Sequence, residues 1–448
     1  MKHPDLLALK GLSTLGINDV EDHYCIEAAG TVVPEACLVC HSALYRHGSQ
    51  RQAYMDTPMH GKQVLIEIDR KRYRCKSCGK TLFEPLSAMD DKRLMTARLV
   101  KYIESHCLKK TFADISREVG VNDKTIRHIF DDHVGNLKAT VHFETPEVLG
   151  IDELNIVGQH RAMITNVQKL TLYDMLPSRT KADLIPYFKK MPDKERVKVL
   201  TMDLWSVYRQ VAQAQFQGRP IVADRFHVVR MANEAIERFR KTLRKGLDNK
   251  TRLKLKDDRF ILLARRHNLS VGQLDTLARW THEFPDLGAA YEAKELFHGI
   301  YGHRNKADAM KAAKHWEATI DPSIDWAFRE LKGALHSWRE EIFNHYDYPV
   351  SNAYTESINS IAKGMNRMGR GYSFEVIRAR LLYDKKARAA GSETIRKKSR
   401  KSQVPDELTV GFMGMNTMDA ETDDGHRVIE CGPHLPTLAK LLEDGYFA

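Results

Sequence analysis

The sequence predicts a multidomain α/β protein in which a strand-rich domain follows two smaller modules. Three observations indicate this arrangement. Two Cys-x-x-Cys pairs lie within residues 36–86, three helix-like segments follow in 90–135, and short apolar runs at hairpin-like spacing begin near residue 147. A block with an almost entirely helical pattern, residues 250–345, interrupts the strand-rich part. At 448 residues the chain is long enough for two to four domains.

The composition is that of an ordinary globular protein, with 42% hydrophobic and 29% charged residues. A net charge of +11 and a pI near 9.1 favour a polyanionic partner, although charge alone does not establish one. The opening residues lack the apolar core of a signal peptide, and no stretch approaches the roughly 18 apolar residues of a membrane span. Seven cysteines, an odd number, indicate a reducing compartment rather than a disulfide framework. We therefore expect a cytoplasmic protein.

The paired cysteines predict a structural zinc site. Cys37 and Cys40 form one knuckle and Cys75 and Cys78 form the other, so that four thiolates can complete a tetrahedral site with Zn–S distances of about 2.3 Å. We expect residues 1–35 to be irregular and a β-hairpin containing Val64–Arg74 to fill the long gap between the pairs, as in a zinc ribbon. Four thiolates leave no open coordination position, which indicates a structural metal. Substitute ligands remain possible at His41, His47 and His60, and inert thiols are expected at Cys25, Cys107 and Cys431.

The segment after the cysteines has the pattern of a helix-turn-helix. Thr111 followed by Asp114 resembles a capping box, Gly120 suits the turn, and Asn122 can cap the next helix. The apolar residues recur at helical spacing, at Phe112, Ile115, Val119, Ile126, Ile129 and Phe130. The side chains left to face a DNA major groove and its phosphates are Lys124, Thr125, Arg127 and His128. A plain three-helix structural bundle remains the alternative.

From residue 147 the pattern predicts strands and then alternating helices and strands. The expected strands are Val148–Leu154, Arg161–Val167, Leu170–Leu176, Val197–Met202 and Pro220–Ala223. The expected helices cover about 179–190, 204–215 and Phe226–Leu247.

Three acidic residues carry the candidate chemistry. Asp152 and Asp203 each end an apolar, strand-like run, and Glu356 lies in a later helix-like stretch. Side chains at two strand ends and on one helix can converge, and a cluster of carboxylate oxygens suits Mg²⁺, which phosphodiester chemistry uses in pairs. Asp224 follows another buried-looking run and is a rival for the second carboxylate, which the sequence does not decide.

The helix that carries Glu356 has two contrasting faces. Its apolar residues, expected to face the core, are Tyr354, Ile358, Ile361 and Met365. The opposite stripe holds Glu356, Asn359, Lys363 and Arg367. A solvated polar face is the simple explanation, but the stripe also offers a metal ligand and phosphate contacts, at Lys363 and Arg367, in one row.

Several stretches together resemble the transposases of the ISL3 insertion-sequence family. They are Gly150–Glu153, Thr201–Trp205, Ala223–Val228, Ser351–Glu356 and Gly369–Tyr372, and the likeness runs from the cysteine pairs to about residue 385. By position, Asp152, Asp203 and Glu356 match the family's triad. Family members often have glycine after the final carboxylate, whereas this chain has Ser357, which is also small. The acidic end beyond residue 405 lies outside the resemblance.

The resemblance implies an RNase H-like catalytic core of the DDE type. The chain would then divide into a zinc-ribbon-like module (1–88), a helix-turn-helix DNA-binding domain (89–145), the first part of the core (146–249), a helical insertion (250–345), the final core helices (346–390) and a charged C-terminal tail (391–448). Asp152 would bridge two Mg²⁺ or Mn²⁺ ions that Asp203 and Glu356 complete, and water and then a DNA 3′-hydroxyl would attack by in-line displacement. The expected partners are the terminal inverted repeats, target DNA and further copies of the chain, in a dimer or higher assembly associated with the nucleoid.

Two other functions remain open from the sequence. A non-catalytic zinc and helix-turn-helix DNA-binding regulator, derived from a transposase, would leave the three acidic residues without a role. A zinc-dependent hydrolase would need an open metal position, and no His-Glu-x-x-His or similar spacing is present.

Overall fold

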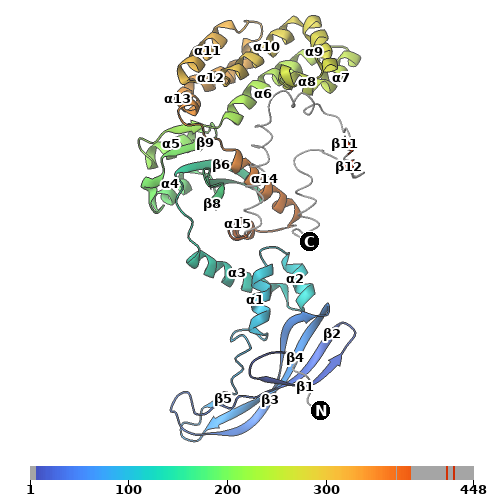
Figure 1. Cartoon of the computed structure of the whole chain (residues 1–448), viewed down its shortest axis with the longest axis vertical. Helices are drawn as coiled ribbons and strands as arrows, with labels where there is room; N and C mark the ends of the chain where they lie inside the picture. Colours follow the sequence, from blue (N-terminus) through green and yellow to red (C-terminus); the bar gives the residue numbers. More distant parts are fainter. Residues whose placement is uncertain (1–6, 370, 385–419, 422–426, 429–448) are drawn as a thin grey trace. The chain divides into compact units, whose positions relative to one another are not determined.

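A computed structural model describes residues 7–369, 371–384, 420–421 and 427–428 of the 448-residue chain (Figure 1). The chain divides into two compact units between His142 and Phe143, and each unit is described separately. The predicted charged tail, 391–448, lies outside the described residues apart from two short paired strands, β11 (Ala420–Glu421) and β12 (Arg427–Val428).

The first unit opens with a five-stranded sheet in the order β1-β2-β4-β3, with β5 paired to β4. Its strands are β1 (Leu12–Asp19), β2 (His23–Gly30), β3 (Leu44–Met59), β4 (Lys62–Cys75) and β5 (Thr81–Phe83). β2 and β4 are parallel, and the other neighbours are antiparallel. The fully buried Ile26, Ile66 and Ile68 form the centre of its core.

One expectation for this sheet holds and one is wrong. The hairpin predicted around Val64–Arg74 is present as β3 and β4, which pair along most of their length. Residues 1–35 were expected to be irregular, but β1 and β2 form a second hairpin there. The strands escape detection because in β2 only Ile26 and Ala28 are buried apolar side chains, which is too few to mark a strand.

Three helices follow in the same unit, as predicted: α1 (Ala97–His106), α2 (Phe112–Val119) and α3 (Asp123–Thr140). The Thr111 hydroxyl accepts a hydrogen bond from the Asp114 amide and begins α2. Gly120 ends α2 with a φ of +71°, a left-handed conformation that glycine adopts without strain. The Asn122 side chain then accepts from the Lys124 amide to begin α3.

The second unit contains a mixed five-stranded sheet in the order β10-β9-β6-β7-β8. The strands are β6 (Val148–Ile156), β7 (Gln159–Asn166), β8 (Thr171–Leu176), β9 (Val199–Met202) and β10 (Ile221–Ala223). β6, β7 and β8 are antiparallel neighbours, whereas β9 is parallel to both β6 and β10. The mixed-sheet prediction is therefore confirmed.

Helices cover the two faces of this sheet (Figure 1). Leu149 and Ile151 pack with apolar side chains of α4 (Lys181–Lys189) and α5 (Ser206–Gln215). Alternate residues of a strand point to opposite faces, so Gly150 and Asp152 point to the other side. That side is covered by α14 (Ala353–Met368), and α15 (Phe374–Tyr383) contacts β8.

A helical bundle with its own core occupies the predicted insertion, residues 250–345. Its helices are α7 (Asn249–Asp257), α8 (Arg259–Leu263), α9 (Val271–Glu283), α10 (Pro285–Ile300), α11 (Lys306–Thr319), α12 (Asp325–Ser337) and α13 (Arg339–Phe343). The preceding helix, α6 (Arg225–Leu243), had been expected in the catalytic core, but its apolar side chains pack in the core of this bundle. Trp280, Trp316 and Trp338 are buried in this core. Within the described part of the chain, no helix is both long and apolar enough to cross a membrane.

Candidate active site and zinc centre

Three aspartates stand side by side at one end of the parallel strands. Ile151 of β6 pairs with Met202 of β9, and Met202 pairs with Ala223 of β10. In each strand the next residue is an aspartate, at positions 152, 203 and 224. The pairing therefore places three carboxyl groups in a row at the carboxyl end of the parallel strands, where α/β proteins commonly bind ligands.

Helix α14 adds a fourth carboxylate to this row. Ligand atoms of Asp152, Asp203 and His227 lie within 4.8 Å of one another, and so do those of Asp224, His227 and Glu356. His227 belongs to both groups. The three predicted acidic residues and Asp224 thus lie in two adjoining groups, and the structure does not choose between Asp203 and Asp224.

His227 supplies positive charge among these carboxylates. Its Nδ1 atom lies 3.0 Å from Asp203 Oδ1 and 3.1 Å from Asp224 Oδ2. Burial acts to lower the pKa of His227, but the adjacent carboxylates of Asp203 and Asp224 outweigh it and raise the pKa to about 10. The imidazolium thus neutralises part of the negative charge gathered here.

Asp152 is more deeply buried than Asp203, the carboxylate beside it. Its side chain is only 4% exposed. Burial, followed by the nearby Asp203 carboxylate, raises the pKa of Asp152 to about 9. Its Oδ1 accepts a hydrogen bond from the Glu153 amide at 2.7 Å, and its Oδ2 accepts one from Asn359 Nδ2 at 2.7 Å.

Asn352, which immediately precedes α14, and Asn359 within α14 hold strand β6 on either side of Asp152. Asn352 Nδ2 donates to the Ile151 carbonyl at 3.1 Å, and Asn359 Nδ2 also donates to the Glu153 carbonyl at 3.2 Å. The pairing of β9 with β6 ends at Ile151. Beyond that point the two asparagine side chains supply the hydrogen bonds to β6 that a neighbouring strand would otherwise make. The expectation that Asn359 lies on a polar outer stripe with Lys363 and Arg367 is wrong for this residue: Asn359 is 5% exposed, whereas the other two are exposed.

The residues present fit divalent cations. The donor set is rich in carboxylate oxygens, which Mg²⁺ and Mn²⁺ prefer. Asp203 Oδ1 is buried without a hydrogen bond, because the His227 N–H that lies near it is directed to Asp224. Unsatisfied negative charge and a raised Asp152 pKa are what a bound cation would relieve.

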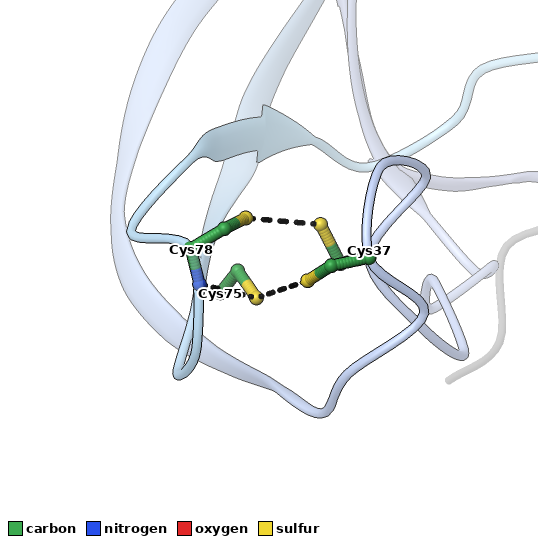
Figure 2. A group of neighbouring side chains, drawn as sticks. Cys37, Cys75 and Cys78 are labelled. Carbon is green, nitrogen blue, oxygen red and sulfur yellow. Dashed lines mark hydrogen bonds between the residues drawn. The ribbon is translucent and has the colours of Figure 1, made fainter.

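The four predicted zinc ligands form one cluster in the first unit. The Sγ atoms of Cys37 and Cys78 are 3.6 Å apart and those of Cys40 and Cys75 are 3.3 Å apart, and all four lie within 4.8 Å of one another (Figure 2). A tetrahedron with Zn–S bonds of about 2.3 Å has edges of about 3.8 Å, so the spacing suits Zn²⁺. Among the described residues, no histidine joins this cluster, so the three candidate substitute histidines do not take part.

The two knuckles repeat the same backbone turn. The His41 amide donates to the Cys37 carbonyl and the Gly79 amide donates to the Cys75 carbonyl, and both residues have a positive φ. Hydrogen bonds from the side chain and the backbone of Ser42 lower the pKa of the Cys40 thiol to about 6. At Cys78 a backbone hydrogen bond from Lys80 acts to lower the pKa, but burial and the three neighbouring cysteines raise it to about 11. The two turns therefore favour the thiolate that zinc requires unequally.

The candidate DNA-reading residues lie on the exposed side of α3. Lys124, Arg127 and His128 are exposed, and Thr125 is half-buried. Thr125 and His128 line a cavity of about 640 Å³ together with Lys92 and Arg93 from the segment before α1. Basic side chains therefore flank the face of α3 that the helix-turn-helix pattern assigns to DNA.

Comparison with known families agrees with this architecture. A family model described as transposase, of the ISL3 DDE group, matches residues 149–381. The chain belongs to the ISL3 family of transposases. The helix-turn-helix domain of transposase family ISL3 matches residues 84–134, and the zinc-finger of transposase IS204/IS1001/IS1096/IS1165 matches residues 34–78.

A curated relative extends the similarity over most of the chain. The chain is 24% identical to the transposase for insertion sequence element IS1001 of Bordetella parapertussis over 341 residues, which cover 73% of this chain and 82% of the relative. The zinc-ribbon, helix-turn-helix and DDE transposase assignments made from the sequence are thus confirmed for this ISL3-family transposase.

Two residues at the acidic site of this ISL3-family transposase were missed by sequence reasoning. His227 follows Asp224 by three residues at the start of α6, a spacing that places both side chains on one helical turn, and this signal was available. Asn359 follows Glu356 by three residues on α14 but had been assigned to the solvated face. An amide among apolar neighbours looks the same in a sequence whether it is solvated or bonded to a buried carboxylate.

Proposed function

We propose that this transposase binds the terminal inverted repeats of its insertion sequence and catalyses metal-dependent cleavage and strand transfer of DNA. One observation carries the proposal: the register of β6, β9 and β10 and the docking of α14 place Asp152, Asp203, Asp224 and Glu356 in two adjoining groups that share His227. A binding protein alone would have no use for four carboxylates gathered at such electrostatic cost.

Asp152, Asp203 and Glu356 would hold the catalytic Mg²⁺ or Mn²⁺ ions, with Asp224 as a fourth ligand or a support for His227. When bound, a pair of such ions lowers the pKa of an attacking water or hydroxyl and stabilises the leaving oxygen of a phosphodiester. The reaction would be hydrolysis at the ends of the element, followed by attack of the freed 3′-hydroxyl on target DNA, with no covalent link between protein and DNA.

The remaining side chains of the site would position these ligands. His227 holds Asp203 and Asp224 at about 3 Å from one nitrogen, which limits their repulsion before DNA arrives. Asn359 fixes the orientation of Asp152, so that each oxygen of Asp152 already accepts one hydrogen bond. Preorganised ligands of this kind lose little entropy when a cation and substrate bind.

Recognition of the terminal repeats would fall to the first unit. Lys124, Thr125, Arg127 and His128 on α3 would contact bases and phosphates, and the zinc ribbon would add contacts beside them. In the second unit, Lys363 and Arg367 extend from α14 beyond Glu356 and would bind phosphates next to the scissile bond. Because two ends must be joined in one event, we expect a dimer or higher assembly on DNA.

The decisive test uses duplexes that carry the inverted repeats flanking the coding region. We expect the Asp152→Asn, Asp203→Asn and Glu356→Gln variants each to lose cleavage in Mg²⁺ by at least about 10³-fold while binding the repeats normally. Asp275→Asn, an exposed aspartate of α9, is the matched control and should cleave as the wild type does. Wild-type protein that binds the repeats but never cuts them would favour the non-catalytic regulator.

The same assay assigns Asp203 and Asp224. If Asp203 is the second metal ligand, Asp203→Asn loses cleavage at every Mg²⁺ concentration. In Asp224→Asn, cleavage should instead be reduced and partly restored by higher Mg²⁺. Replacing a supporting residue outside the ligand shell typically changes metal affinity by about 10–100-fold. If Asp224→Asn instead loses cleavage at every Mg²⁺ concentration and Asp203→Asn is partly restored, Asp224 is the metal ligand and Asp203 the supporting residue.

A further inference from the structure

A strongly basic surface lies at the far end of α6, away from the site just described. Residues 238–259 contain ten lysines and arginines and three aspartates. We define the α7 basic surface by five exposed side chains on and just before α7: Lys245, Lys250, Arg252, Lys254 and Lys256. It is distinct from the lysine and arginine of α14 considered above.

The charges of this surface are not neutralised by other residues that the structure describes. Nearby basic residues on α6 and α8 do have acidic partners: Arg238 pairs with Glu330, and Arg240, Lys241 and Arg259 share Glu237. By contrast, none of the five side chains of the α7 basic surface forms an ion pair with another described residue. Asp248 begins the helix by accepting from the Lys250 and Thr251 amides.

The local packing gives no structural reason for this concentration of charge. Leu255 is the single buried residue of α7. Lys250 and Lys254 are one turn apart, as are Arg252 and Lys256, and like charges at this spacing destabilise a helix slightly. The helix therefore bears a small electrostatic cost that a polyanion would offset.

Helix α6 sets the distance from this surface to the acidic site. Asp224 immediately precedes α6 and His227 lies in its first turn, whereas Leu243 ends it two residues before Lys245 (Figure 1). Nineteen residues at a rise of about 1.5 Å give a rod of about 28 Å. With about 3.4 Å per base pair along B-DNA, this length corresponds to roughly eight base pairs.

We propose that the α7 basic surface binds the phosphate backbone of duplex DNA about eight base pairs from the scissile bond. This inference rests on the proposed function, because it takes the acidic row as the place where DNA is cut. Lysine and arginine contacts to phosphates carry no sequence information, so the surface would hold the duplex in line with the active site whatever its sequence. It would thus act separately from the repeat-reading helix of the first unit.

The salt dependence of DNA binding tests the contact. The triple variant Lys250→Gln, Arg252→Gln and Lys254→Gln is compared with a charge-matched control, Arg304→Gln, Lys311→Gln and Lys314→Gln, whose side chains are exposed on and beside α11. The probe is a fluorescent duplex with one inverted repeat and 20 base pairs of flank. We expect the slope of log K against log salt concentration to fall by about two to three for the α7 variant and to stay at the wild-type value for the control.

Photocrosslinking tests the position. Leu253 is 53% exposed at the centre of the surface, and p-benzoylphenylalanine at this position should crosslink to DNA about one helical turn or less from the cleavage site. An unchanged slope in the α7 variant, an equal loss in the control, or crosslinks only to distant DNA would overturn the proposal. None of these results affects the cleavage test of Asp152→Asn. If Asp152→Asn protein still cleaves DNA, the proposed function is overturned, and the salt slopes can still be measured independently.

Discussion

Asn359 Nδ2 donates a hydrogen bond to Asp152 Oδ2 at 2.7 Å, across 207 residues of sequence. Asn359 stands on α14 one turn after Glu356, and Asp152 is the first residue of β6 beyond its pairing with β9. The helix that supplies the last carboxylate therefore also orients the first one. Asp152 therefore becomes oriented when α14 packs against β6.

Replacing Asn359 should weaken metal binding before it weakens the fold. In Asn359→Ala, Asp152 keeps its place but loses a donor that fixes its orientation, so we expect the affinity for Mn²⁺ to fall by about 10–100-fold. Titration of Mn²⁺ followed by electron paramagnetic resonance measures this directly. Cleavage should require proportionally more Mg²⁺ and should recover when Mg²⁺ is raised.

Asn366→Ala on the same helix is the matched control, because Asn366 is half-buried two turns further along. It should bind Mn²⁺ as the wild type does. A lower melting temperature in Asn359→Ala with unchanged Mn²⁺ affinity would show that Asn359 serves only the packing of α14.

Gly150 should tolerate no side chain. A Cβ atom there would lie 2.4 Å from Thr165 Oγ1 and 2.7 Å from Asn352 Oδ1, so α14 could not approach β6 as closely. We expect Gly150→Ala to lower the free energy of unfolding of the second unit by about 1–3 kcal/mol. Gly333→Ala in α12, where a Cβ atom meets nothing within 4 Å, should be neutral or stabilising by up to about 1 kcal/mol. Denaturant unfolding measures both, and equal stability of the two variants would contradict this account.

The metal-free protein should lose stability as the pH rises. The folded-state pKa of Asp152, about 9, is above its ordinary value of 3.8, so between these limits the unfolded chain binds fewer protons than the folded one. Stability linked to this group is therefore complete below about pH 4 and declines as the pH rises toward 9. Without divalent ions, Asp152→Asn should melt at least about 2 °C above the wild type at pH 8, and the difference should shrink toward pH 5.

Divalent ions should reverse the order of the melting temperatures of the wild type and Asp152→Asn. Mg²⁺ or Ca²⁺ at pH 8 should raise the melting temperature of the wild type and leave that of Asp152→Asn nearly unchanged, because a ligand stabilises only the state that binds it. Asp275→Asn should follow the wild type under both conditions. Parallel pH profiles for wild type and Asp152→Asn would mean that the carboxyl group is not electrostatically strained.

Zinc should support the first unit alone. The buried Cys75 joins the end of β4 to the other knuckle, so Cys75→Ser should reduce bound zinc from one atom per chain to nearly none and lower the melting temperature of the first unit. Elemental analysis and calorimetry measure the two effects. Cys25→Ser, a cysteine outside the cluster, should keep its zinc, and the melting transition of the second unit should not change in either variant.

Much of both units could be predicted because the signals are local. Each parallel strand contains a short apolar run that is followed by aspartate. The spacing of the paired cysteines identifies the zinc knuckles. Register is different, since it depends on how strands pair. The row formed by Asp152, Asp203 and Asp224 follows from Ile151, Met202 and Ala223 lying level, which no single segment reveals. For that reason the sequence left Asp203 and Asp224 as rivals when both stand in the row.

The features that escaped prediction depend on contacts between distant segments. The hydrogen bond from Asn359 to Asp152 and the place of His227 between Asp203 and Asp224 are visible only after folding. The β1–β2 hairpin was missed because it buries few large side chains and gains its strand character by pairing with β4. Tertiary context, rather than local propensity, decides such cases.

The separation between Asp152 and α14 has a consequence for the timing of activity during synthesis. The strands that carry the aspartates emerge from the ribosome first, and the whole helical insertion must follow before Glu356 and Asn359 can reach them. A nascent chain can therefore fold its zinc ribbon and its helix-turn-helix while its acidic site is still incomplete. Under the proposed function, translation itself would delay the first DNA cleavage until α14 has been synthesised.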